Sequence, residues 1–265
     1  YVYSAMADLA RITKDQTLVA ACDRLWRNIV NKQMYITGGI GSTHHGEAFS
    51  FDYDLPNDTV YAETCASVGL IFFAQRMLRI RPHAEYADVM ERALYNTVLA
   101  GMAQDGKHYF YVNPLEVWPQ ASRRNPGKHH VLPQRPGWFG CACCPPNVAR
   151  LIASLDQYAY SVDQDTLYAH LYVGGQLSAA IHDDEVRLQV DTEYPWNGKV
   201  SMKLSLQKEK QFRLALRIPG WCEQASLTIN GNLIEMESRI QHGYVYVDRI
   251  WKDGDQLDLQ LEMPI

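Results

Sequence analysis

Three of the six cysteines in this 265-residue chain fall within four residues, in the segment Cys141-Ala142-Cys143-Cys144-Pro145-Pro146-Asn147. The two prolines restrict the preceding cysteine to extended backbone and suit the opening of a helix, so we expect the thiols at a helix N-terminus. The free amides and the dipole of a helix N-terminus favour a thiolate. Because the thiolate is the form of cysteine that binds metal ions, the cluster predicts a metal site.

A second segment, Tyr61-Ala62-Glu63-Thr64-Cys65-Ala66, supplies a carboxylate and a thiol two residues apart. Residues at i and i+2 point to the same side of an extended chain but lie about 200° apart on a helix. Glu63 and Cys65 can therefore face one ion only if this segment is extended or irregular before its helix begins. The upstream Asn57-Asp58-Thr59 could instead start a helix at Val60, and both interpretations stay open.

Together Glu63, Cys65, Cys143 and Cys144 form a cysteine-rich ligand set with one oxygen, which suits the borderline-soft zinc ion. The alternative treats Cys65 and the clustered thiols as small buried hydrophobes and Glu63 as a solvated or capping acid. Clustering beside a carboxylate favours ligation over disulfides. Cys22 and Cys222, outside both motifs, are interpreted as buried structural thiols.

Helical periodicity surrounds these motifs in the first part of the chain. The predicted helices cover about residues 1–12, 16–32, 61–79, 83–101 and 145–162, and a short hairpin strand is predicted at 107–113. Residues 33–60 break the pattern with glycines and prolines, forming a long irregular segment of the kind often kept for function. This segment carries His44, His45 and Glu47.

From about Asp165 the apolar period changes to two. Gly174-Gly175, Asn197-Gly198 and Asn230-Gly231 are interpreted as hairpin signals of an antiparallel sheet. We therefore predict an α+β chain of two domains, residues 1–164 and 165–265. A helical pattern is already under way at Tyr1, and the chain stops at Pro264-Ile265 directly after a strand-like run, so we expect it to be part of a longer protein.

The composition narrows the classes of partner. A net charge of −5 and a pI near 6.0, without a basic run, argue against nucleic acid. No apolar run approaches the length of a membrane span, and no signal segment is seen at the N-terminus, so we expect no membrane partner and a cytoplasmic location. Sixteen tyrosines and six tryptophans suit sugar surfaces, although aromatic residues are also ordinary core material.

Five motifs occur in an order that resembles glycoside hydrolase family 127, whose members include bacterial β-L-arabinofuranosidases. They are Tyr-Ile-Thr-Gly-Gly-Ile-Gly-Ser at 35–42, Gly46-Glu47-Ala48-Phe49, Tyr61-Ala-Glu-Thr-Cys-Ala66, Asn113-Pro-Leu-Glu116 and Cys141-Ala-Cys-Cys-Pro-Pro-Asn147. The resemblance implies part of an (α/α)6 barrel followed by a β-sandwich. It also implies an enzyme, a retaining glycosidase that releases terminal β-L-arabinofuranose from an oligosaccharide or glycoconjugate.

Residue by residue, the resemblance implies zinc held by Glu63, Cys65, Cys143 and Cys144. It makes Cys143 the nucleophile and Glu47 the acid/base, with Tyr111 contacting the substrate. Spacing alone does not distinguish Cys143 from its neighbour as nucleophile.

Two other functions stay open. A closed zinc site could be purely structural, in a carbohydrate-binding or scaffold protein; the discriminating feature is whether Glu47 faces an open pocket beside Cys143. A cysteine hydrolase of amides would instead need a histidine beside the nucleophile, for which the candidates are His44, His129 and His130. The oligomeric state stays open between a monomer and a homodimer.

Overall fold

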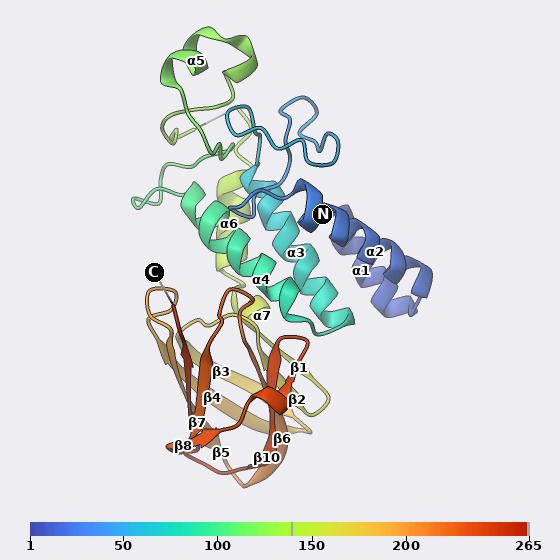
Figure 1. Ribbon diagram of the computed structural model, residues 1–265, viewed down its shortest axis with the longest axis vertical. Helices are drawn as coiled ribbons and strands as arrows, with labels where there is room; N and C mark the ends of the chain where they lie inside the picture. Colours follow the sequence, from blue (N-terminus) through green and yellow to red (C-terminus); the bar gives the residue numbers. More distant parts are fainter. Residues whose placement is uncertain (139, 264–265) are drawn as a thin grey trace. The chain divides into compact units, whose positions relative to one another are not determined.

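The computed structural model describes residues 1–138 and 140–263, in two compact units (Figure 1). Unit 1 consists of Tyr1–Pro82 with Val89–Ala153, and unit 2 of His83–Asp88 with Ser154–Ile265. The expectation about the chain end at Pro264-Ile265 lies outside the described residues. Among the described residues, no helix is long and apolar enough to cross a membrane.

Unit 1 is built from helices and long connections. Its elements are α1 Val2–Thr13, α2 Gln16–Asn28, a π-helix Ile29–Gln33, α3 Thr64–Ile80, the second half of α4 Ala84–Ala93, a π-helix Leu94–Leu99, α5 Pro119–Arg124, a 3-10 helix Pro126–Lys128 and α6 Cys144–Ile152. Helix α3 is buried along most of its length and contacts α1 and α6. Because α3 is apolar on nearly all sides, it forms the centre of this unit.

The segment before α3 is irregular, and the helix begins three residues later than predicted. Glu63 forms a β-bridge with Val112, and the Thr64 amide donates to the Tyr111 carbonyl at 2.9 Å. The Asn113 side chain also donates to the Ala62 carbonyl at 2.9 Å. These bonds occupy the backbone before Thr64, which settles the open question in favour of an irregular approach to the helix.

Two other predicted elements differ from the structure. Residues 107–113 form only isolated bridges, Met102 with Tyr109 and Glu63 with Val112, so the predicted hairpin strand is wrong. The helix predicted over 145–162 begins at Cys144, ends at Ile152 and is followed by the short helix α7 Asp156–Ala159 and by β1 Tyr160–Asp163. The first strand therefore begins before the predicted change of period at Asp165.

Unit 2 contains two β-sheets. Its further strands are β2 Thr166–Ala169, β3 Gly175–Ile181, β4 Asp184–Thr192, β5 Lys199–Leu206, β6 Lys210–Arg217, β7 Ala225–Ile229, β8 Asn232–Ile234, β9 Ile240–Gln241, β10 Tyr244–Trp251 and β11 Gln256–Leu261. The sheet orders are β1-β2-β6-β10-β9 and β3-β4-β5-β11-β7-β8. The β2–β6 pair is parallel and the other described pairs are antiparallel, so the predicted wholly antiparallel sheet needs this correction. In β4 and β11 buried and more exposed residues alternate, so each strand turns one face to the core.

The hairpin signals identify some turns and miss others. Asn230-Gly231 joins β7 to β8 with φ of 51° and 78°, as a type I′ turn requires. Gly174-Gly175 instead leads from β2 in one sheet to β3 in the other, so it is not a hairpin turn. His182-Asp183 turns between β3 and β4 with positive φ and without glycine, which explains why it was missed.

A glycine fixes the irregular segment of unit 1 against the end of α4. Gly38 has φ of 79°, and a Cβ there would lie 2.7 Å from the Cα of Ala93. Gly46 has a similar φ of 74° but has no atom within 4 Å of such a Cβ. We predict that Gly38→Ala lowers the free energy of unfolding by roughly 3 kcal/mol, from left-handed strain plus overpacking. Gly46→Ala, the matched control, should lower the free energy of unfolding in urea by only about 1 kcal/mol, from left-handed strain alone. Equal losses in the two variants would contradict the close packing at Gly38.

Unit 2 contains a fully buried histidine, His170. Its ring nitrogens lie 2.7 Å from the hydroxyls of Ser161 and Tyr244, and burial lowers its pKa from 6.5 to about 3. Because the unfolded chain takes up this proton first, stability should be lost as the pH falls from about 6.5 towards 3. The loss should approach about 1.4 kcal/mol per pH unit. In urea unfolding between pH 6.5 and 5, the stability of the parent should fall more steeply than that of His170→Gln, which bonds hydroxyls without titrating, and the difference in slope should approach this value; equal slopes would contradict the prediction.

Candidate metal centre

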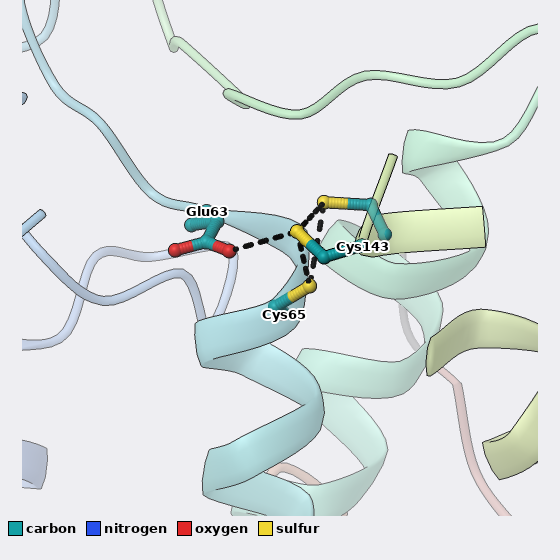
Figure 2. A group of neighbouring side chains, drawn as sticks. Glu63, Cys65 and Cys143 are labelled. Carbon is teal, nitrogen blue, oxygen red and sulfur yellow. Dashed lines mark hydrogen bonds between the residues drawn. The ribbon is translucent and has the colours of Figure 1, made fainter. Parts of the chain in front are cut away.

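Four side chains from two distant motifs converge in unit 1. One potential ligand atom from each of Glu63, Cys65, Cys143 and Cys144 lies within 4.8 Å of all the others. Cys65 Sγ is 3.2 Å from Cys143 Sγ and 3.5 Å from Cys144 Sγ, and Cys143 Sγ is 3.6 Å from Glu63 Oε1. Figure 2 shows Glu63, Cys65 and Cys143 pointing toward one another. The structure therefore brings together all four residues of the predicted ligand set.

Two helix starts position these groups. Glu63 is the N-cap residue of α3 and Cys65 lies in its first turn, while Cys143 is the N-cap residue of α6 and Cys144 its first helical residue. Both helices thus direct their partly positive N-terminal ends at the cluster, which favours negative ligands there. Cys141 is exposed and is not part of the group.

Burial limits how much negative charge the cluster can hold without a cation. It raises the pKa of Glu63 to about 7 and that of Cys143 to about 12. The pKa of Cys144 is also raised, by its hydrogen bond with Cys65 and by burial, whereas the same hydrogen bond lowers the pKa of Cys65 to about 6. A divalent cation would supply the missing positive charge. Three sulfurs and one oxygen are a donor set suited to a borderline-soft metal, so the residues fit such an ion.

Glu47 lies at the tip of a turn close to this cluster. The turn is closed by a bridge between Thr43 and Ala48, and Glu47 has a left-handed φ of 51°, uncommon for a residue with a side chain. Its Oε1 accepts hydrogen bonds from the hydroxyls of Tyr61, at 2.8 Å, and Tyr111, at 2.9 Å. Burial and then a hydrogen bond with Cys143 raise the pKa of Tyr111. One phenol therefore connects the carboxyl group of Glu47 to a sulfur of the cluster.

Glu47 also borders a cleft of about 360 Å³. Glu63 and Cys65 line the same cleft, together with the aromatic rings of Tyr1, Tyr3, Phe49 and Phe73. Cys143 is not among these lining residues, but its sulfur lies 3.2 Å from that of Cys65. A cleft with acidic and aromatic walls beside a metal-binding group has the form of a ligand site.

The candidate histidines do not lie in hydrogen-bonding contact with the clustered thiols. His44 stacks on His130 with ring centroids 4.3 Å apart, and His130 Nε2 lies 3.0 Å from the Thr59 carbonyl. His45 and His129 lie in loops. Within residues 1–138 and 140–263, the side chains that hydrogen-bond to Cys143 are those of Glu63, Cys65, Tyr111 and Cys144. The arrangement gives the cysteine–histidine amide hydrolase no support.

Tyr61 and Asn147 belong to the sequence motifs, but the motifs alone assign neither residue a role. Tyr61 donates to Glu47, and Asn147 Nδ2 lies 2.9 Å from Cys65 Sγ. Asn147 follows Cys143 by four residues, the spacing that returns to the same helix face, so a signal was present. The expectation of two buried structural thiols needs one correction: Cys22 is buried, but Cys222 is only half-buried.

Two family models cover most of the chain. The β-L-arabinofuranosidase GH127 catalytic domain matches residues 2–157, and the β-L-arabinofuranosidase GH127 middle domain matches residues 166–263. The first match spans the helical unit that carries the cysteine–glutamate cluster, and the second spans the strands of the two-sheet unit. The chain belongs to glycoside hydrolase family 127.

The similarity extends to characterised and solved relatives. The chain is 44% identical over 270 residues to the non-reducing end β-L-arabinofuranosidase of Bifidobacterium longum subsp. longum, covering 99% of this chain. It resembles the crystal structure of a GH127 β-L-arabinofuranosidase from Geobacillus stearothermophilus T6, with a TM-score of 0.96, 52% identity, and coverage of 99% of this chain and 41% of that one. The GH127 β-arabinofuranosidase BT3674 gives a TM-score of 0.89 and 38% identity over 100% of this chain and 42% of its own. The chain spans 40% of the length of the curated relative.

We predict that the chain binds one divalent metal ion through the four clustered residues. The double variant Cys65→Ala, Cys144→Ala should lose the metal, because two ligands of a four-ligand site cannot both be dispensable. Elemental analysis after dialysis measures this, and Cys222→Ala is the matched control because that thiol bonds the Gln224 carbonyl outside the cluster. Full metal content in the double variant would remove the cluster as the binding site.

Proposed function

We propose that the protein containing this chain is a zinc-dependent retaining glycoside hydrolase that releases terminal β-L-arabinofuranose. Membership of family 127 supports this substrate class, as does the printed activity of the relatives. The single observation that carries the mechanism is the phenol of Tyr111, which joins Glu47 to Cys143 beside a cleft. Retention requires an acid/base and a nucleophile close together, and these two residues supply them.

Zinc would be held by Glu63, Cys65, Cys143 and Cys144, and when bound it would keep the thiols deprotonated at neutral pH. The helix N-termini at Cys65 and Cys143 favour the same ionised state. Burial excludes water from Cys144, so this sulfur serves to hold the ion rather than to meet substrate. Cys143 is half-buried, which leaves its sulfur the more accessible member of the adjacent pair.

In the proposed reaction, Cys143 Sγ attacks the anomeric carbon while Glu47 donates its proton to the leaving oxygen, and the glycosidic C–O bond breaks. Glu47, now ionised, then accepts a proton from water, whose oxygen attacks the same carbon and breaks the C–S bond. Two displacements at one carbon return the starting configuration. Glu47 therefore works first as an acid and then as a base.

The two tyrosines would orient Glu47 for both steps. Both hydroxyls donate to Oε1, which leaves Oε2 available for the travelling proton. The left-handed backbone at Glu47 is energetically unfavourable, and this strain accompanies the placement of the carboxyl group beside the cleft. Tyr111 would also contact the bound sugar, since its hydroxyl lies between the two reacting side chains.

We also propose the larger architecture and setting. Unit 1 would belong to an (α/α)6 barrel, and the two sheets of unit 2 would form a β-sandwich, with the domains divided at residues 1–164 and 165–265. The partner would be an arabinose-containing oligosaccharide or glycoconjugate, and the location cytoplasmic. The rival is a structural zinc site in a non-catalytic protein; zinc binding without any release of L-arabinose would support it.

Glu47→Ala is expected to lower the rate of L-arabinose release from a natural glycoside by about 10²- to 10⁴-fold, the usual contribution of a general acid/base. On a synthetic β-L-arabinofuranoside with a good leaving group, hydrolysis of the intermediate should slow more than its formation. Added azide should then restore turnover, because it attacks without needing a base. Glu116→Ala is the control, since that exposed carboxylate accepts from the Trp118 indole outside the cleft. Wild-type rates in Glu47→Ala would remove it from the mechanism.

A mechanism-based arabinofuranosyl inactivator is expected to label Cys143. A zinc-held thiolate is a far better nucleophile toward an anomeric carbon than the other side chains of the cleft. Peptide mass spectrometry of the digested protein locates the added mass. The Cys143→Ser variant, treated with the same inactivator, is the control and should carry no label at this position. A label on Glu63, or an inverted product seen by NMR, would instead point to chemistry between carboxylates.

A further inference from the structure

Helix α6 supplies more to the metal-binding cluster than its two cysteines. Asn147 lies one turn after Cys143, whose carbonyl accepts from the Asn147 amide at 3.2 Å. Its side-chain Nδ2 reaches across to helix α3 and lies 2.9 Å from Cys65 Sγ. Figure 1 shows α3 and α6, the two helices that this bond connects. One helix therefore carries two ligands and also holds the thiol ligand of the other helix.

The orientation of the Asn147 amide is fixed by Arg150. An asparagine amide can usually be turned over without a visible change, because its oxygen and nitrogen look alike. Arg150 Nη2 lies 2.6 Å from Asn147 Oδ1, and a guanidinium can only donate hydrogen bonds. The oxygen must therefore face Arg150, and the NH₂ group must face the sulfur of Cys65.

Arg150 is itself held in place by aromatic rings. Its guanidinium lies 4.8 Å from the ring centroid of Phe72 and 5.8 Å from that of Tyr1. The Tyr1 hydroxyl also donates to the Cys65 carbonyl at 3.0 Å. Tyr1 therefore contacts both Arg150 and the backbone of Cys65. Stacking of this kind stabilises a cation and fixes its plane.

We infer that Asn147 is a positioning residue for the metal centre, oriented by Arg150, and that its N–H···S bond holds the sulfur of Cys65 in place as a ligand. The inference rests on the metal centre proposed above. A donor aimed at sulfur stabilises the ionised form, because charge-assisted hydrogen bonds are about twice as strong as neutral ones. The bond also withdraws electron density from Cys65, which makes this buried sulfur a poorer nucleophile than the half-buried Cys143 and assigns the two thiols different tasks.

The test measures metal binding rather than hydrolysis. Zinc affinity is determined by competition with a chromophoric chelator, and the sulfur-to-metal charge-transfer bands are recorded with cobalt(II) in place of zinc. We expect Asn147→Leu, which keeps the side-chain shape, to weaken zinc binding by about 10- to 100-fold, the usual effect of losing an outer hydrogen bond to a ligand. The cobalt bands should shift at the same time, because they report the electron density on sulfur.

Two further variants separate the parts of the arrangement. Asn147→Asp is nearly isosteric but cannot donate, so it should bind zinc at least as weakly as Asn147→Leu, and it carries the test if the leucine variant unfolds. Arg150→Met keeps an aliphatic stem against Phe72 and frees the amide to turn, so its loss should be smaller but measurable. Asn96→Leu is the matched control, because the Asn96 amide bonds the Arg92 carbonyl and none of the four ligands.

The outcomes are distinct. Thermal unfolding without metal should be alike in the parent, Asn96→Leu and the test variants, which excludes a general loss of structure. Zinc affinity within about twofold of the parent and unshifted cobalt bands in both Asn147 variants would overturn the inference while leaving the metal centre intact. A parent chain that binds no zinc would overturn the metal centre and the inference together.

Discussion

The sulfur atoms of Cys65 and Cys143 lie 3.2 Å apart although they are 78 positions apart in the sequence. Two helices must start at the same point to bring them together, and each directs its N-terminal dipole at the shared cluster. Burial opposes the negative charge of so many ligands, and a metal ion would relieve that opposition. The rest of unit 1 can be understood as the framework that keeps α3 and α6 in this relation.

The irregular segment between α2 and α3 carries Glu47, the residue proposed as acid/base. Its glycines allow close passage beside α4, as Gly38 shows, and its tip presents Glu47 in a left-handed conformation. Ala62 is also left-handed, with φ of 40°, and it separates Tyr61, which bonds Glu47, from Glu63, which faces Cys143. With Tyr53, at φ of 66°, the segment has three non-glycine residues in this unfavourable conformation, and the surrounding hydrogen bonds must offset the strain.

The four clustered residues could be predicted because their chemistry is local: prolines mark a helix start, and clustered thiols beside a carboxylate suggest ligation. The start of α3 could not be predicted, since it depends on the Asn113 side chain and the Tyr111 carbonyl, partners far along the chain. The turn at His182-Asp183 was missed because nothing in its composition requires positive φ. The parallel pairing of β2 with β6 likewise follows from tertiary packing, which hydrophobic alternation does not report.

The roles of Tyr61 and Asn147 were missed for a different reason. Each contacts a side chain of another segment for which a catalytic or ligating role is proposed, so the residue type alone carries little information. Only the distances, 2.8 Å to Glu47 and 2.9 Å to Cys65, show what each side chain does. Side chains that orient the reacting groups are thus harder to find from sequence than the reacting groups themselves.

X-ray absorption at the zinc edge of the purified, zinc-loaded protein counts the sulfur and oxygen neighbours of the ion and so identifies its ligands. If the four clustered residues bind the ion, we expect three sulfur neighbours at about 2.3 Å and one oxygen or nitrogen neighbour at about 2.0 to 2.2 Å. A first shell made only of oxygen and nitrogen, or a shell with a single sulfur, would contradict it.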